Sequence, residues 1–122
     1  MLKNLLLVGF GGAIGSMLRY AATLLLNSKY FPYATLAVNI IGCFIIGLVF
    51  AISIKNENFL NNWKLFLATG ICGGFTTFAA FSLETMELLQ REKIGMAVTY
   101  IGLSIVLGIA ATFFGYQLIR EL

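Results

Sequence analysis

The chain has 122 residues, of which 60% are hydrophobic and only 11% are charged. A water-soluble fold of this length could not cover so much apolar surface, which excludes a soluble enzyme. With no histidine and only 5 acidic residues, a histidine metal site and a Ser-His-Asp triad are excluded as well. The net charge of +3 comes from basic residues that stand singly rather than in a patch, so no nucleic-acid partner is expected.

Long uncharged runs separate the charged residues along the whole sequence. Each run is close to the ~20 residues that a helix needs to cross a hydrocarbon layer of about 30 Å. We therefore predict an all-α membrane protein, with residues 1–122 forming a single integral membrane domain in the lipid bilayer. Its four membrane-spanning helices are expected at about residues 4–27, 33–54, 65–88 and 95–118.

Four spans would place both chain ends on one side of the membrane. Without the intramembrane Arg19, that side carries four basic residues and the other side three: Lys3, Lys55, Lys64 and Arg120 against Lys29, Arg91 and Lys93. Orientation follows an excess of Lys and Arg on the cytoplasmic side. With so small a difference, we expect insertion in both orientations and pairing with an inverted copy. The alternative is that the insertion machinery resolves even a difference of one charge.

The first predicted helix carries a strip of small residues at Gly11, Gly12 and Gly15, followed by Arg19. Such a strip is typical of close helix packing in membranes. A guanidinium at this depth needs acceptors or water. Arg19 either extends back to the membrane surface from a tilted helix or faces an aqueous vestibule.

In the second predicted helix, Thr35 and Asn39 stand four residues apart and therefore share a face, which Gly42 and Cys43 continue. An intramembrane asparagine often holds two helices together by hydrogen bonds. Asn39 also offers two N–H donors, which an anion would need. Cys43 is interpreted as a small packing group, since neutral thiols in apolar runs usually pack.

The third hydrophobic run, residues 70–82, contains Gly73 and Gly74 followed by Thr76 and Thr77. Glycine disfavours a helix interior by about 1 kcal/mol relative to alanine, and threonine hydroxyls compete for backbone partners. We therefore predict a break in this span. Backbone carbonyls freed by such a break are tolerated in a membrane where something binds, and in an inverted dimer two breaks could present them to one cation.

Two polar or aromatic patterns follow the predicted break. Phe78 and Phe81 share a helix face, and aromatic rings carry a positive edge that can be turned toward an anion. On the fourth predicted helix, hydroxyls and a glycine recur every four residues at Tyr100, Ser104, Gly108 and Thr112. Either this stripe lines a pathway, or its hydroxyls bond back to carbonyls of the preceding turn.

Three motifs of the chain, taken in order, resemble those of the CrcB/Fluc family of bacterial fluoride channels. They are the runs Gly11–Tyr20, Thr35–Phe44 and Gly70–Ser82, and the similarity extends over essentially the full length. The resemblance implies an antiparallel, dual-topology dimer with two fluoride pores and a structural Na⁺ at its centre. It also implies passive fluoride efflux and resistance to fluoride, from a multi-pass position in a bacterial plasma membrane, the inner membrane.

The resemblance also assigns expected roles to individual residues. The pore is expected to be lined by Asn39, Phe78, Phe81, Tyr100, Ser104 and Thr112, with Thr35 one turn from Asn39. Arg19 and Glu84 are expected at the vestibule, and the main-chain carbonyls of Gly73 and Thr76 on the Na⁺. Ala79, Ala80 and Gly108 depart from the family pattern, which places a hydroxyl residue between the two phenylalanines and a serine at the third position.

Three alternatives remain open at this level. A small four-helix multidrug exchanger also forms an antiparallel dimer, but it needs a membrane-embedded carboxylate, and the first helix has none. A purely structural subunit would give no reason for an interrupted helix. The sequence does not choose between a homodimer and a heterodimer with a paralogous chain.

Overall fold

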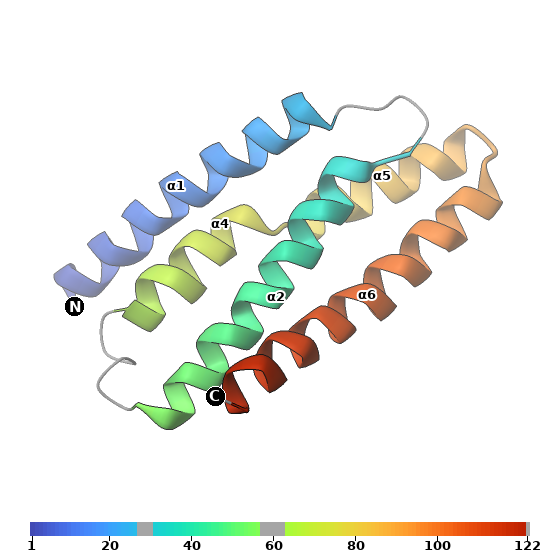
Figure 1. The fold of residues 1–122 in the computed structure, drawn as a ribbon. Coiled ribbons are helices and arrows are strands. Elements are labelled where there is room, and N and C mark those ends of the chain that lie inside the picture. Colours follow the sequence, from blue (N-terminus) through green and yellow to red (C-terminus); the bar gives the residue numbers. More distant parts are fainter. Residues whose placement is uncertain (27–30, 57–62, 122) are drawn as a thin grey trace.

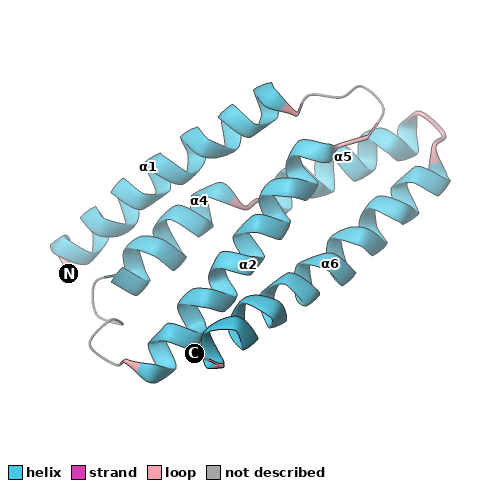
Figure 2. Ribbon diagram, viewed as in Figure 1, coloured by secondary structure: helices cyan, strands magenta, loops and turns pink. Residues whose placement is uncertain are grey.

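The computed structural model describes residues 1–26, 31–56 and 63–121. Its helices are α1 (Leu2–Leu25), α2 (Tyr33–Lys55), the π-helix η1 (Leu65–Cys72), α4 (Gly73–Phe75), α5 (Phe78–Gln90) and α6 (Ile94–Arg120). Figure 2 shows the described residues as helices joined by short loops. Lys29, which was counted in the charge comparison, lies outside the described residues.

Among the described residues, four segments are long and apolar enough to cross a membrane: α1, α2, the combined span Leu65–Gln90, and α6. They run along one another as a bundle, and the labelled N- and C-terminal ends lie toward the same end of it (Figure 1). Helix α2 packs mainly along α6, while α1 packs along η1 and α4. The predicted all-α architecture with four apolar helices is thus confirmed.

Glycines permit the closest helix contacts. A Cβ atom added at Gly11 would lie 2.6 Å from the carbonyl oxygen of Phe66 in η1, and one added at Gly15 would overlap the carbonyl oxygen of Ile71. On the other side of the bundle, a Cβ at Gly47 of α2 would overlap the carbonyl oxygen of Thr112 in α6. The glycine strip of the first helix therefore packs against the third span, as its spacing indicates.

The third span is broken, as predicted, and the break lies at the threonines. Thr76 and Thr77 are extended, with ψ of 155° and 122°, between α4 and α5. Gly73 is still helical, and a Cβ at Gly74 would lie 2.5 Å from the carbonyl oxygen of Gly12. The glycines thus serve the contact with α1, whereas the two β-branched threonines adopt the extended backbone that ends the helix.

The turns before the break are wider than in an α-helix. The N–H of Gly73 donates to the carbonyl of Ala68, five residues earlier, as well as to that of Gly70. A π-helix of this kind is rare and concentrates at functional positions. The third span therefore departs from regular α-helix geometry twice, at the π-helix η1 and at Thr76 and Thr77, with the short α4 between them.

Candidate functional site

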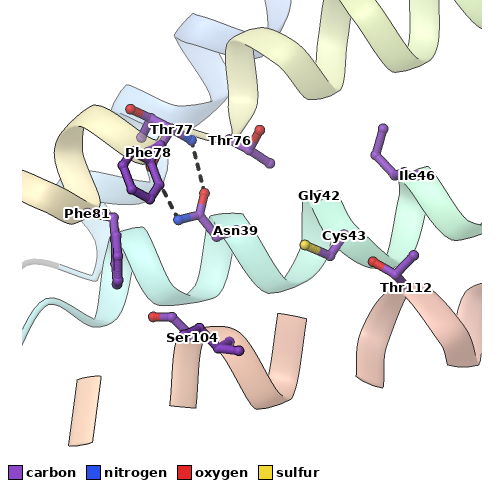
Figure 3. A pocket seen from close by; sticks show the side chains of 11 residues that line it. Asn39, Gly42, Cys43, Ile46, Thr76, Thr77, Phe78, Phe81, Ser104 and Thr112 are labelled. Atoms are coloured by element: carbon purple, nitrogen blue, oxygen red, sulfur yellow. Dashed lines mark hydrogen bonds between the residues drawn. The ribbon is translucent and has the colours of Figure 1, made fainter. Parts of the chain in front are cut away.

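An open cavity of about 330 Å³ lies where α2, the break, α5 and α6 meet. The close-up of Figure 3 shows polar and aromatic side chains from these elements around it. No charged side chain of the described residues contributes to its lining. The lining residues are Asn39, Gly42, Cys43, Ile46, Thr76, Thr77, Phe78, Phe81, Ser104, Ile105 and Thr112.

Asn39 of α2 holds the break through two hydrogen bonds with one residue. Its Oδ1 accepts from the backbone N–H of Thr77 at 3.0 Å, and its Nδ2 donates to the Thr77 carbonyl at 3.3 Å (Figure 3). The amide therefore replaces the backbone partners that Thr77 would have in a continuous helix. It holds two helices together, and its second N–H leaves a donor for another group.

The hydrogen bonds at the break leave the carbonyls of Gly73 and Thr76 without their helical donors. In an α-helix the N–H of Thr77 would donate to the Gly73 carbonyl and that of Ala80 to the Thr76 carbonyl. The Thr77 N–H instead donates to Asn39, and the Ala80 N–H donates to Thr77 Oγ1 at 3.1 Å. Carbonyl oxygens freed in this way are suitable ligands for a hard cation, and the two predicted Na⁺ ligands are the carbonyls concerned.

Arg19 of α1 donates a hydrogen bond to another carbonyl at the break, that of Gly74. Its Nε donates to the Gly74 carbonyl at 3.2 Å, and the residue is partly buried. In an unbroken helix this carbonyl would accept from Phe78, which now begins α5. Arg19 therefore reaches across to the third span, while its predicted place at an aqueous vestibule stays a prediction.

The N-terminal end of α5 borders the cavity. Thr77 caps this helix by accepting from Ala80, and both Thr77 and Phe78 line the cavity. The first N–H groups of a helix have no acceptor within it, and the helix dipole makes this end partly positive. The break thus brings a positive helix end to the middle of a membrane-spanning segment.

Phe78 and Phe81 both line the cavity, with ring centroids 5.6 Å apart at an angle of 46° (Figure 3). Phe81 also packs on Tyr100 of α6, with a centroid separation of 5.0 Å. Phe78 is 78% exposed in the single chain. The helix spacing therefore correctly predicts that the two rings are neighbours.

Glu84 of α5 forms a polar cluster with two hydroxyls. Thr35 Oγ1 donates to Glu84 Oε1 at 2.7 Å, and the Tyr100 hydroxyl donates to Oε2 at 3.0 Å. Thr35 and Tyr100 are buried, and Glu84 is half-buried. None of the three belongs to the lining of the cavity, so the structure divides the predicted site residues into a cavity and an adjoining carboxylate cluster.

The predicted polar stripe of α6 has three different outcomes. Tyr100 bonds to Glu84, and Thr112 bonds back to the Gly108 carbonyl at 3.1 Å, which is the alternative considered for this helix. The Ser104 hydroxyl oxygen is buried, lines the cavity and has no hydrogen-bond partner within the described residues. An unsatisfied buried hydroxyl is costly, so one placed in a cavity marks a place for a ligand or water.

Sequence reasoning left out several lining residues. The sequence places Gly42 and Cys43 on the face of Asn39 but predicts only a packing role for Cys43, and it gives no role to Ile46. All three follow Asn39 at intervals of three, four and seven residues, which is the spacing of one helix face. A Cβ at Gly42 would overlap the methyl group of Thr76, so Gly42 makes room for the break.

Comparisons with a family model and with individual known proteins point to the same family. Residues 6–116 match the family model described as "CrcB-like protein, Camphor Resistance (CrcB)". The chain is 46% identical to the Fluoride-specific ion channel FluC of Azobacteroides pseudotrichonymphae over 121 residues, or 97% of each chain. It is 46% identical to FluC of Flavobacterium psychrophilum over 99% of this chain and 100% of that one, and 45% identical to FluC of Agrobacterium fabrum over 98% of each.

These matches span nearly the whole sequence and agree with the apolar helices of the fold. The chain is a multi-pass membrane protein. With a family model that covers residues 6–116 and relatives identical at almost every second position, it belongs to the CrcB family.

Proposed function

We propose that the chain forms a fluoride-selective channel through which fluoride leaves the cell passively, conferring resistance to its toxicity. The observation that carries the proposal is the identity of about 45% to fluoride-specific channels over nearly the full chain. These relatives are named as channels and not as enzymes. Because they come from bacteria, we place this chain in a bacterial plasma membrane.

The cavity supplies groups suited to a small, strongly hydrated anion. The buried Ser104 hydroxyl, the second N–H of Asn39 and the N-terminal end of α5 are donors that can replace water around fluoride. The edges of Phe78 and Phe81 add a weakly positive surface. Since none of the described residues that line the cavity is charged, binding would be weak enough for the ion to leave again.

Glu84, Thr35 and Tyr100 would lie beside this path rather than in its narrowest part. Both carboxylate oxygens accept hydrogen bonds from hydroxyls, which holds the negative charge in place. A fixed carboxylate near a pore entrance keeps the two hydroxyls oriented. We propose that this cluster borders the vestibule, with Arg19 providing a positive charge beside the break.

The working unit proposed is an antiparallel homodimer with two pores. The nearly even distribution of basic residues favours insertion in both orientations. In such a pair the freed Gly73 and Thr76 carbonyls of each copy would hold one Na⁺ between them. When bound, the ion offsets the converging carbonyl dipoles and raises the local potential for an anion.

Other assemblies and functions are less well supported. A heterodimer with a paralogous chain would use the same contacts. The exchanger hypothesis is not favoured, because the chain matches fluoride-specific channels over almost their whole length. A purely structural role would leave the unpartnered Ser104 hydroxyl without an explanation.

Replacing either cavity phenylalanine with isoleucine is expected to lower fluoride efflux at least about tenfold. Isoleucine keeps an apolar side chain but removes the ring edge that interacts with the anion. Efflux would be followed with a fluoride electrode from proteoliposomes loaded with fluoride, with no proton or sodium gradient imposed. Phe78→Ile and Phe81→Ile would be compared with Phe113→Ile, since Phe113 is 61% exposed on α6 away from the cavity lining.

Absence of fluoride efflux from wild-type vesicles would end the channel proposal. Efflux that requires a proton gradient would favour an exchanger. If Phe81→Ile and Phe113→Ile lowered fluoride efflux equally, the cavity would not be part of the fluoride pore.

Ser104→Ala is expected to change stability and transport in opposite directions. Removing a buried hydroxyl without a partner should raise the free energy of unfolding by about 1 kcal/mol, whereas fluoride efflux should fall because a donor is lost. Unfolding in detergent and efflux from vesicles would be measured on the same preparation. Ser82→Ala serves as the control, since Ser82 is exposed on α5 and does not line the cavity. A Ser104→Ala protein that is less stable than wild type, or that conducts equally well, would contradict this role.

A further inference from the structure

A groove lies between the beginning of α1 and the beginning of the third span, and it shares no lining residue with the cavity. Two adjoining hollows of about 350 and 340 Å³ share Lys3, Leu7 and Phe66 in their lining, so they form one groove. Leu6 and Phe10 complete the first hollow, and Trp63 completes the second. The proposed pore makes no use of this groove.

The groove has one charged end and one apolar end. Lys3 is the second residue of α1, and Phe10 stands seven positions further along, or about 10 Å along the helix axis. Beyond Phe10 the groove closes, because α1 meets the third span at Gly11, where an added Cβ would lie 2.9 Å from the Cα of Gly70. A polar head with an apolar tail of limited depth would fit this shape.

The charged end is basic. Lys3 lines both hollows and is exposed. Lys64 lines neither hollow, but it directly follows the lining residue Trp63 and is also exposed. Among the residues that the structure describes, no carboxylate belongs to the lining of either hollow. Within the part of the chain that the structure describes, no ion pair is found for Lys3 or Lys64. Each lysine near a membrane surface attracts anionic lipid by about 1 kcal/mol.

The aromatic residues of the groove match the boundary of a membrane. Trp63 is 58% exposed and meets the ring of Phe66 edge to face, with centroids 6.3 Å apart. Tryptophan concentrates at the level of lipid headgroups, where its N–H stays hydrated and its ring is buried. Leu6 and Phe10 are 63% and 71% exposed, which leaves apolar wall open toward the bilayer.

From the basic end, the apolar depth and the tryptophan at the boundary, we propose that this groove binds an anionic phospholipid. Its phosphate would lie at Lys3, which lines both hollows, and the upper part of one acyl chain would lie along Leu7 and Phe66. A zwitterionic phospholipid offers the same chain without net negative charge, so it should bind more weakly. This site is independent of the ion path and would be present in either orientation of the chain.

The test uses the single tryptophan of the chain, because Trp63 is itself part of the groove. The protein would be reconstituted in phosphatidylcholine vesicles that contain a small fraction of lipid with brominated acyl chains, and quenching of tryptophan fluorescence would be measured. Brominated phosphatidylglycerol should quench more strongly than brominated phosphatidylcholine at the same mole fraction. Lys3→Gln should lower the relative affinity for the anionic lipid about fivefold.

Arg120→Gln is the matched control, since it removes one exposed positive charge from α6, outside the groove. It should leave the quenching difference between the two lipids unchanged. Equal quenching by both lipids, or equal effects of the two substitutions, would reduce the site to general charge attraction and overturn the proposal. Quenching by neither lipid would mean that protein, such as a second copy, covers the groove, which also overturns it.

Discussion

Asn39→Ala is expected to destabilise the backbone at the break in the third span and to abolish fluoride efflux. The substitution removes both hydrogen bonds to Thr77 and leaves a backbone N–H and a carbonyl without partners inside the membrane. Each unsatisfied buried group costs about 1–3 kcal/mol, so the free energy of unfolding should fall by several times the thermal energy. Unfolding would be measured by circular dichroism in detergent, and efflux with a fluoride electrode.

Cys43→Ala provides the matched control for Asn39→Ala. Cys43 lines the same cavity one turn further along α2, and its loss leaves the bonds between Asn39 and Thr77 intact. This variant should unfold close to wild type. If Asn39→Ala were as stable as Cys43→Ala, the side-chain amide would not be what holds the break.

Gly15→Ala is expected to destabilise the protein although alanine is the better helix former. An added Cβ would overlap the Ile71 carbonyl oxygen and lie 2.8 Å from the Phe75 backbone nitrogen, and backbone atoms cannot move aside without shifting a helix. Overpacking of this kind costs about 1–3 kcal/mol, which exceeds the roughly 1 kcal/mol that alanine contributes through helix propensity. The shift would separate α1 from the third span and disturb the bond from Arg19 to Gly74.

Gly9→Ala isolates the propensity effect within the same helix. Apart from the neighbouring backbone of α1, no atom of the described residues lies within 4 Å of a Cβ added at Gly9, so this variant should be as stable as wild type or slightly more so. Thermal unfolding of the two variants, measured side by side in one detergent, gives the comparison. A Gly15→Ala protein that matches Gly9→Ala would show that the close approach at Gly15 does not limit stability.

Much of the fold follows from one-dimensional patterns. The uncharged runs locate four helices, because a charge in hydrocarbon is costly and few segments can exclude it. Weak helix formers between residues 70 and 82 locate the break. The sequence does not show which residues of that run pack and which adopt the extended backbone, because this depends on which helix lies opposite. Gly74 faces Gly12 of α1, so it packs, and the extended backbone falls to Thr76 and Thr77.

The site was predictable to a lesser degree, because a polar residue in a membrane has several ways to find a partner. Periodicity correctly brings Phe78 next to Phe81 and indicates the face of Asn39. It does not reveal that the Asn39 amide bonds to the backbone of Thr77, or that Glu84 gathers Thr35 and Tyr100. For Thr112 the hydroxyl bonds within its own helix, whereas Ser104 on the same stripe remains unpartnered.

The most direct test of the account compares fluoride and chloride in the same vesicles. Proteoliposomes loaded with both ions would be opened to flux by a potassium ionophore, with one electrode for each ion. The account expects fluoride to leave while chloride stays inside. The cavity binds an anion through a few hydrogen-bond donors and the ring edges of Phe78 and Phe81, and not through a charged side chain of the described residues. Efflux of both ions at similar rates, or of neither, would contradict it.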